Sequence, residues 1–434
     1  GVPVIKLIDY LSKENFRKEA LVITSASFFD IVKQLDEVRK LDGCRCFLMP
    51  GLKETYKDRY LSLSQDRQSA LNFYEENNTD GKHYQVWECI SYAEHAGSKA
   101  PSDIKKILSD LGYASFNVHT NNVDESTDSS CWQYVQSKEE WDKVYEMIPS
   151  DATLVLQHPF STENILRDET FQRLKKKGVS IISIVHDVEE VRQISMTPYL
   201  KTEHELMLDI ADVLVVHNDV MKEYFVGEGY PQDRIISLEV FDYLLDTQKV
   251  GNVSFEKHIA FAGSLEERKS PFLKELPKLS PVCVRLYGPD YDPKMFDSES
   301  IQNNIQYQGS FPTERIPFEL NEGFGLVWDG ESIETCSGPT GEYLKLISSH
   351  KLSLYIVSGL PVIIWSKAAM ASFVKAKDIG IIVDSLLEIP DVMATMKEER
   401  YLEMANNAKK LAARLTEGFY LKNAIQKAVR LVNN

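Results

Sequence analysis

Short runs rich in β-branched residues alternate with helical segments through most of this chain. Before residue 250 they occur at residues 84–87, 153–156, 180–185 and 213–216. After residue 250 they recur at residues 258–262, 284–287, 324–328, 362–365 and 381–383. Strands that alternate with helices form parallel sheets covered by helices. Two such series predict an α/β protein with two Rossmann-like domains, which bind ligands at the carboxyl ends of their strands.

The first 81 residues carry a separate α/β pattern. It consists of predicted strands at 20–24 and 46–49, a predicted amphipathic helix around 29–40, and a polar linker at 75–81. The pattern predicts four parts: an N-terminal α/β appendage (1–81), two Rossmann-like domains (82–250 and 251–418), and a final helix (419–434). Because the chain opens on Gly1-Val2-Pro3 without a methionine, we expect it to be a piece of a larger multidomain chain.

Composition restricts the classes of partner and location. The net charge of −16 argues against nucleic acid as a partner, since phosphate binding needs basic surface. The sequence has no run of 18 apolar residues and therefore predicts no transmembrane helix. Cys44-x-Cys46 has no matching second pair to complete a metal site, so we expect reduced thiols in a cytoplasmic protein.

Residues 348–361 combine helix signals with a cation. Ser348 and Ser349 predict the start of a helix and Gly359 predicts its end. Lys351 falls in the first turn, where a positive charge opposes the helix dipole. A bound anion would explain it, because helix N-termini offer free N–H groups to phosphate. The alternative is a lysine that reaches into solvent, and the residues alone do not decide between the two.

Five segments together carry a resemblance to a known family: AGSLEERKS (262–270), LYGP (286–289), GSFPTERIPFELNEGFGLVWDG (309–330), SSHKLSLYIVSGLPVIIW (348–365) and ARLTEGFYLKNAI (413–425). They resemble one family of glycosyltransferases with the GT-B fold, over about residues 82–434. That family includes bacterial glucosyltransferases that extend O-glycans on serine-rich adhesins, and β-galactofuranosyltransferases of surface polysaccharides.

The resemblance implies a fold and an activity. The two Rossmann-like domains would face a cleft, and the final helix would pack back on the N-terminal domain through Leu421, Ile425 and Val429. The activity would be transfer of a hexose, galactofuranose or glucose, from a UDP-sugar to a glycan, glycoprotein or lipid-linked acceptor. We expect no Asp-x-Asp motif in the donor loops, and on that ground we expect neither a metal ion nor a cofactor.

The resemblance also assigns donor-binding residues. Gly263 and Ser264 would form the turn after the first strand of the C-terminal domain, with Arg268 as a pyrophosphate contact. Tyr287 would contact the nucleoside, and His350 and Lys351 would meet the phosphates. The full predicted donor set is Gly263, Ser264, Arg268, Tyr287, Gly288, His350 and Lys351.

The N-terminal domain is expected to bind the acceptor. Gly97 and Ser98 are predicted in a loop before a helix that Ser102 caps, and Gln157 and His158 end a strand. His186 and Asp187 end the next strand and match a His-Asp pair of the family. We predict Asp187 as the general base and His186 as a residue that shapes its loop. Three alternatives stay open: the two roles reversed, both residues as simple caps, or a base elsewhere, with Glu94 or His158 next in line.

Two other classes of protein are compatible with parts of this pattern. A non-catalytic GT-B partner subunit would keep the fold and lose donor residues, and the intact His350-Lys351 pair argues against it. A nucleotide-sugar epimerase or dehydrogenase should carry a glycine-rich fingerprint after residues 84–88, which the sequence lacks. The basic run 173–177 is either a solvated helix end or a contact with anionic lipid at the inner face of the cell membrane.

Overall fold

The computed structural model describes residues 81–89, 96–119, 140–160, 165–193, 198–245, 253–297 and 304–433, and three short strands nearer the N-terminus. These residues belong to two compact units. One comprises Gly1–Cys89, Tyr113–Ile181 and Ser195–Ala211, and the other comprises Ile90–Gly112, Ile182–Ile194 and Asp212–Asn434. This division differs from the domains at 82–250 and 251–418, whose bounds stay a prediction.

Two of the three short strands lie where the sequence predicts them. β1 (Ala20–Ile23) and β2 (Arg45–Leu48) pair in parallel, which confirms the strands expected near 20–24 and 46–49. The helix predicted around 29–40 falls outside the described residues. β3 (Phe73–Glu75) lies within the predicted appendage but pairs antiparallel with β5 (Ala114–His119).

A seven-stranded sheet has the order β3-β5-β4-β6-β7-β8-β9. Its other strands are β4 (His83–Cys89), β6 (Thr153–His158), β7 (Ser180–Val185), β8 (Val213–Val216) and β9 (Ile235–Ser237). The associated helices are α5 (Ala96–Asp110), α7 (Ile165–Lys177), α8 (Glu189–Arg192), α9 (Pro198–Ile210) and α10 (Asp219–Gly227). All residues of β6 and β8 are buried, as expected for strands covered on both faces.

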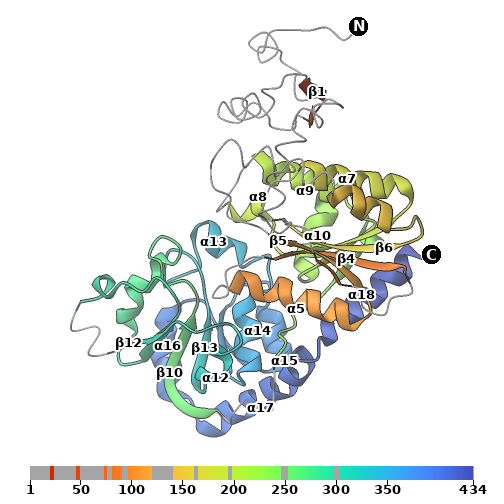
Figure 1. Ribbon diagram of the computed structural model, residues 1–434. Coiled ribbons are helices and arrows are strands. Elements are labelled where there is room, and N and C mark those ends of the chain that lie inside the picture. Colours follow the sequence, from red (N-terminus) through yellow and green to blue (C-terminus); the bar gives the residue numbers. More distant parts are fainter. Residues whose placement is uncertain are drawn as a thin grey trace. The chain divides into compact units, whose positions relative to one another are not determined.

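The second unit contains a six-stranded parallel sheet in the order β12-β11-β10-β13-β14-β15. Its strands are β10 (Ser254–Ala262), β11 (Cys283–Tyr287), β12 (Ile305–Gly309), β13 (Glu322–Val327), β14 (Val362–Trp365) and β15 (Gly380–Val383). The helices between and after these strands are α12 (Ile316–Glu319), α13 (Gly338–Tyr343), α14 (His350–Val357), α15 (Ala371–Lys377), α16 (Ile389–Thr395), α17 (Glu398–Leu415) and α18 (Phe419–Val432) (Figure 1).

The last helix, α18, lies against β8, β9 and α5 within the second unit. Leu421 and Ile425 are buried there, while Val429 is half-buried. The carboxylate of Asp242 accepts hydrogen bonds from the backbone nitrogens of Tyr420 (3.2 Å) and Leu421 (2.7 Å), so it satisfies free donors in the first turn of α18. Burial raises the pKa of Asp242 to about 7.

No helix among the described residues combines the length and the apolar composition needed to cross a bilayer.

The close packing of β13 against α14 leads to a test of the C-terminal sheet. A Cβ atom on Gly325 would lie 2.1 Å from Cγ of Tyr355, whose hydroxyl accepts a hydrogen bond from the backbone nitrogen of Ala262 at 2.9 Å. Gly325→Ala should therefore lower the free energy of unfolding by about 1–3 kcal/mol, the usual cost of overpacking. The matched control is Gly227→Ala, where a Cβ atom would have nothing within 4 Å. Equal melting temperatures of the two variants in calorimetry would contradict the packing described.

Candidate active site

Two glycines bring the carboxyl ends of β10 and β11 together. The backbone nitrogen of Gly263 donates to the carbonyl oxygen of Tyr287 at 3.0 Å. Gly288 has a φ of +143°, and a Cβ atom there would lie 1.9 Å from the carbonyl oxygen of Gly263. A Cβ atom on Gly263 would lie 3.2 Å from Cε of Lys351. The structure therefore places Gly263, Gly288 and Lys351 side by side, and only glycine fits at position 288.

Lys351 lies in the first turn of α14, and its amine is paired with a carboxylate. Nζ is 2.8 Å from each carboxylate oxygen of Asp329, which follows β13. The side chain of Lys351 is 19% exposed. The alternative prediction, a lysine that reaches into solvent, is therefore wrong. Ser349 occupies the N-cap position as expected, but its side chain makes no capping hydrogen bond. Gly359 ends the helical segment with a φ of +79°, which confirms the predicted stop.

Other residues of the predicted donor set differ in how they are placed. Tyr287 is buried, and burial raises the pKa of its hydroxyl against the opposing effect of Arg285. Ser264 donates through Oγ to a carboxylate oxygen of Asp290 at 3.2 Å. Arg268 is 86% exposed and pairs with Glu266, with 3.5 Å between Nε and Oε1. The structure therefore does not bring Arg268 to Lys351.

One sequence argument about metal is wrong. An Asp-x-Asp motif does occur in a donor-side loop, as Asp290-Tyr291-Asp292, two residues after Gly288. Asp290 accepts the hydrogen bond from Ser264, and Asp292 accepts one from the backbone nitrogen of Lys294 at 2.9 Å. Both aspartates are exposed. The expectation of a metal-free site therefore rests on Lys351 and the N-terminus of α14.

Three histidines surround the ring of Phe241. His186 stacks on it with 5.9 Å between ring centroids and 7° between planes. His217 meets the ring edge-on at 4.7 Å, and His350 lies against it at 4.4 Å. His186 and His350 come from the two separate motifs that the sequence singled out. Phe241 thus brings the predicted acceptor-side and donor-side histidines onto one aromatic ring.

His217 joins the same two motifs by hydrogen bonds. Its Nδ1 accepts from the backbone nitrogen of Ser348 at 3.1 Å, and its Nε2 lies 2.9 Å from the carbonyl oxygen of His186. Because Ser348 N–H can only donate and the carbonyl can only accept, the proton sits on Nε2. Burial, and then the neighbouring His350, lower the pKa of His217 to about 3, so the ring is neutral at ordinary pH.

Asp187 follows β7 and contacts two side chains. Its Oδ2 accepts from Nη1 of Arg192 at 2.9 Å, and its Oδ1 accepts from the hydroxyl of Tyr343 at 3.1 Å. That hydroxyl itself accepts from the backbone nitrogen of Val188 at 2.7 Å. Burial raises the pKa of Asp187 to about 6, although Arg192 acts in the opposite direction. The carboxylate is still 32% exposed, which leaves room for a substrate.

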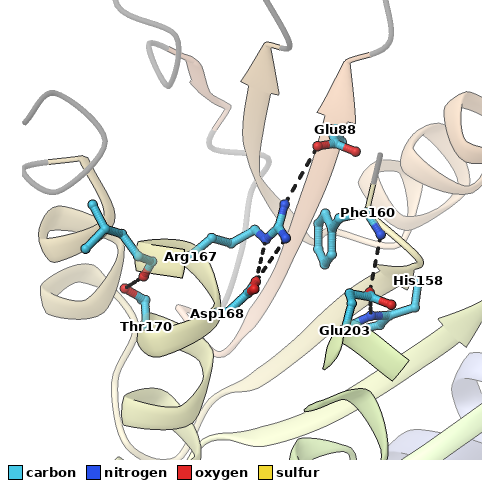
Figure 2. A network of polar contacts seen from close by, with 8 residues as sticks. Glu88, His158, Phe160, Arg167, Asp168, Thr170 and Glu203 are labelled. Carbon is cyan, nitrogen blue, oxygen red and sulfur yellow. Dashed lines mark hydrogen bonds and ion pairs between the residues drawn. The ribbon is translucent and has the colours of Figure 1, made fainter. Parts of the chain in front are cut away.

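The other predicted acceptor-side residues lie in two places. Gln157 and His158 are buried at the end of β6, where Nδ1 of His158 bonds to Glu203 of α9 (Figure 2). Gly97 and Ser98 lie in the first turn of α5 and not in a loop. The prediction that Ser102 caps this helix is wrong, because α5 begins at Ala96 and includes Pro101.

Comparison with known proteins identifies the family. Two models, Glucosyltransferase 3-like N-terminal domain and C-terminal domain, match residues 84–240 and 259–428. The β-1,6-galactofuranosyltransferase WbbI of Escherichia coli (strain K12) is 31% identical over 265 residues, which are 60% of this chain and 73% of that protein. This chain belongs to the glucosyltransferase 3-like family. Glucosyltransferase 3 of Streptococcus gordonii is 23% identical over 331 residues, which are 76% of this chain and 93% of that protein.

Solved structures show that this family member has the GT-B fold. Sucrose-phosphate synthase from Thermosynechococcus elongatus has a TM-score of 0.52 and 11% identity, covering 81% of this chain and all of that chain. Anabaena Alr3699/HepE in complex with UDP and glucose has a TM-score of 0.51 and 13% identity, with the same coverage.

Sequence reasoning missed several residues of this glucosyltransferase 3-like site. His217, Phe241, Asp329 and Tyr343 all contact predicted residues, yet none of them was predicted as a site residue. One signal was available: His217 and Asn218 directly follow β8, at the strand end where α/β sites form. Asn218 caps α10 and also donates to the carbonyl oxygen of Leu346 at 3.0 Å.

The bridge through His217 leads to a stability test. His217→Phe keeps the ring and removes both nitrogens, so the N–H of Ser348 and the carbonyl of His186 lose their partner. Each buried group left unpaired costs about 1–3 kcal/mol, so the melting temperature in calorimetry should fall by several degrees. His217→Gln keeps one donor and one acceptor and should lose less. A Phe variant as stable as the wild type would show that the bridge does not form.

Proposed function

We propose that this chain transfers a hexose from a UDP-sugar to a glycan acceptor, with the diphosphate bound beside Lys351. The observation that supports this most is the cluster of Gly263, Gly288 and Lys351 at the start of α14. Free N–H groups and a fixed cation at a helix N-terminus suit a diphosphate. The alternative, a non-catalytic GT-B partner subunit, is less well supported because this cluster is intact.

The leaving group would be stabilised electrostatically. As the bond between the sugar and the diphosphate breaks, negative charge grows on the phosphate oxygens, and a preorganised cation lowers the energy of that state. Asp329 would hold Lys351 in place until the donor arrives, since its two oxygens already fix Nζ. This arrangement supports a metal-independent transfer, with UDP-sugar as substrate and no cofactor.

The donor sugar would be galactofuranose or glucose, the sugars in the names of the relatives from Escherichia coli and Streptococcus gordonii. The acceptor would be a glycan, a glycoprotein or a lipid-linked saccharide, in surface-polysaccharide or adhesin-glycan assembly in the cytoplasm.

For residues 173–177 we favour a solvated helix end over a peripheral membrane contact, because side chains of this run have partners within the protein. Arg173 pairs with Asp142 at 2.8 Å, and Lys177 donates to the carbonyl oxygen of Ile148 at 2.6 Å.

Asp187 would act as the general base in an inverting transfer, with His186 shaping its loop. A base near neutral pH needs a pKa close to the working pH, and the pKa of Asp187 is raised to about 6. Tyr343 and Arg192 hold the carboxylate by one oxygen each, and the remaining lone pairs can accept the proton of an acceptor hydroxyl.

The donor site is tested by Lys351→Ala. Loss of a charge-assisted contact should weaken UDP binding by about 1.5–3 kcal/mol, roughly ten- to a hundredfold, in titration calorimetry. Lys345→Ala removes a half-exposed lysine that is paired with Glu342, and it should leave UDP affinity unchanged. Wild-type affinity should be the same in EDTA. Normal UDP binding by Lys351→Ala would refute the assignment, and loss of wild-type turnover in EDTA would refute metal independence.

The base is tested by Asp187→Asn and by pH. A general base must be ionised, so kcat/KM should rise with increasing pH as Asp187 loses its proton. Because the pKa of Asp187 is raised from near 4 to about 6, this acid limb of the pH profile should have its midpoint at about pH 6. Asp187→Asn should lower turnover by about 10²–10⁴ and remove this limb, while UDP affinity stays unchanged. The exposed Asp219→Asn is the control. An unchanged limb in Asp187→Asn, or a product with retained anomeric configuration, would contradict this role.

A further inference from the structure

A buried polar cluster lies where the strand order of the seven-stranded sheet reverses. β5 pairs with one edge of β4, and the next strand along the chain, β6, pairs with the opposite edge of β4. The crevice outside the carboxyl ends of such a strand pair is where α/β sheets bind ligands. Glu88 stands near the end of β4, and His158 ends β6. Helices α7 and α9 add Arg167, Asp168 and Glu203 (Figure 2).

His158 and Glu203 form an oriented pair within this cluster. Oε1 of Glu203 bonds to Nδ1 of His158 and also accepts from the backbone nitrogen of Phe160 at 3.3 Å. Because a carboxylate oxygen only accepts, Nδ1 carries the proton, and in the neutral imidazole Nε2 then presents its lone pair. His158 is 1% exposed, and Nε2 has no hydrogen-bond partner in the described part of the chain. Figure 2 shows Glu203 and Phe160 on the same side of the cluster.

An orphaned buried nitrogen is unusual, because buried polar atoms in folded proteins nearly always have a partner. The lone pair on Nε2 and the carboxylate behind the ring indicate that the missing partner is a hydrogen-bond donor. Nε2 with a free lone pair binds a hydrogen-bond donor, and the carboxylate behind it strengthens the nitrogen as an acceptor. A hydroxyl group is such a donor, and sugar acceptors are rich in hydroxyls.

The surrounding charges restrict the ligand further. Arg167 Nη2 is 2.9 Å from Oδ1 of Asp168, and Nη1 is 3.8 Å from Oε1 of Glu88. The guanidinium also lies 4.0 Å above the ring centroid of Phe160. Three carboxyl groups therefore face one guanidinium and a histidine, although burial raises the pKa of Asp168. Such a cluster repels anionic groups and accepts neutral hydroxyls.

We propose that the His158–Glu203 pair is a subsite for a neutral sugar of the acceptor. Nε2 of His158 accepts a hydrogen bond from a sugar hydroxyl, and Glu203 holds the imidazole in the tautomer that allows it. The pair binds the sugar and takes no part in proton transfer. This subsite rests on the proposed function, because an acceptor glycan is its ligand.

The first test observes His158 directly by nitrogen-15 NMR of histidine-labelled protein, assigned with His158→Asn. In the free protein Nδ1 should carry the proton and Nε2 should be bare. Methyl β-glycosides of glucose, galactose and N-acetylglucosamine are the probes, and at least one should shift the Nε2 resonance. Methyl β-glucuronide, the same ring with a carboxylate, should not. A proton on Nε2, no shift with any neutral glycoside, or an equal shift with the glucuronide would overturn the proposal.

The second test separates binding from folding. His158→Asn keeps an amide donor for Glu203 but has no atom in place of Nε2. For the acceptor glycoside that shifts the Nε2 resonance, KM should therefore rise about five- to tenfold. His158→Gln places a polar atom near Nε2 and should lose less. UDP affinity should stay unchanged in both variants. A lower melting temperature with an unchanged acceptor KM would show a structural role only. If wild-type protein fails to bind UDP, the proposed function fails instead of this subsite.

Discussion

The neutral imidazole of His217 is the interaction on which the arrangement of the site depends. One nitrogen receives the N–H of Ser348 and the other donates to the carbonyl of His186, so two loops of the second unit are held by one ring. Among side chains, imidazole presents a donor and an acceptor on opposite edges of a rigid plane. Protonation would turn the acceptor into a donor, and burial prevents it by lowering the pKa of His217 to about 3.

The electrostatics of the donor cluster follow from this fixed frame. Lys351 directly follows His350 in the turn that begins after Ser348, so its position depends on the loop that His217 holds. The close approach of Gly263 and Gly288 leaves the backbone free of side chains beside the amine. Asp329 keeps the amine oriented and partly buried. A charge held this way needs little reorganisation when an anion binds, which is the condition for electrostatic stabilisation of a leaving group.

Asp187 and His158, the two residues for which we propose acceptor-side roles, differ in burial and in titration. Asp187 is one-third exposed, and its carboxyl group has a raised pKa, properties that favour proton transfer. His158 is almost fully buried, and Glu203 fixes its tautomer, properties that favour selective binding of one donor group. These properties fit the separate roles proposed for the two residues, Asp187 as a base and His158 as a hydrogen-bond acceptor for a sugar hydroxyl.

Neighbouring residues suffice to predict the alternation of strands and helices, the glycine that stops the helical segment at 359, and the family. Each of these features depends on residues that are adjacent in the sequence: runs of β-branched residues, a glycine after a helical segment, and contiguous motifs. The sequence could also place Lys351 in the first turn of α14, because helix signals flank it. The partners of the site residues were decided only by the tertiary structure. Tyr343 is 156 residues from Asp187, His217 is 131 from Ser348, and Glu203 is 45 from His158. Hydrogen-bond partners so far apart in sequence are determined by how strands and helices pack, and hydrophobic periodicity does not predict that packing.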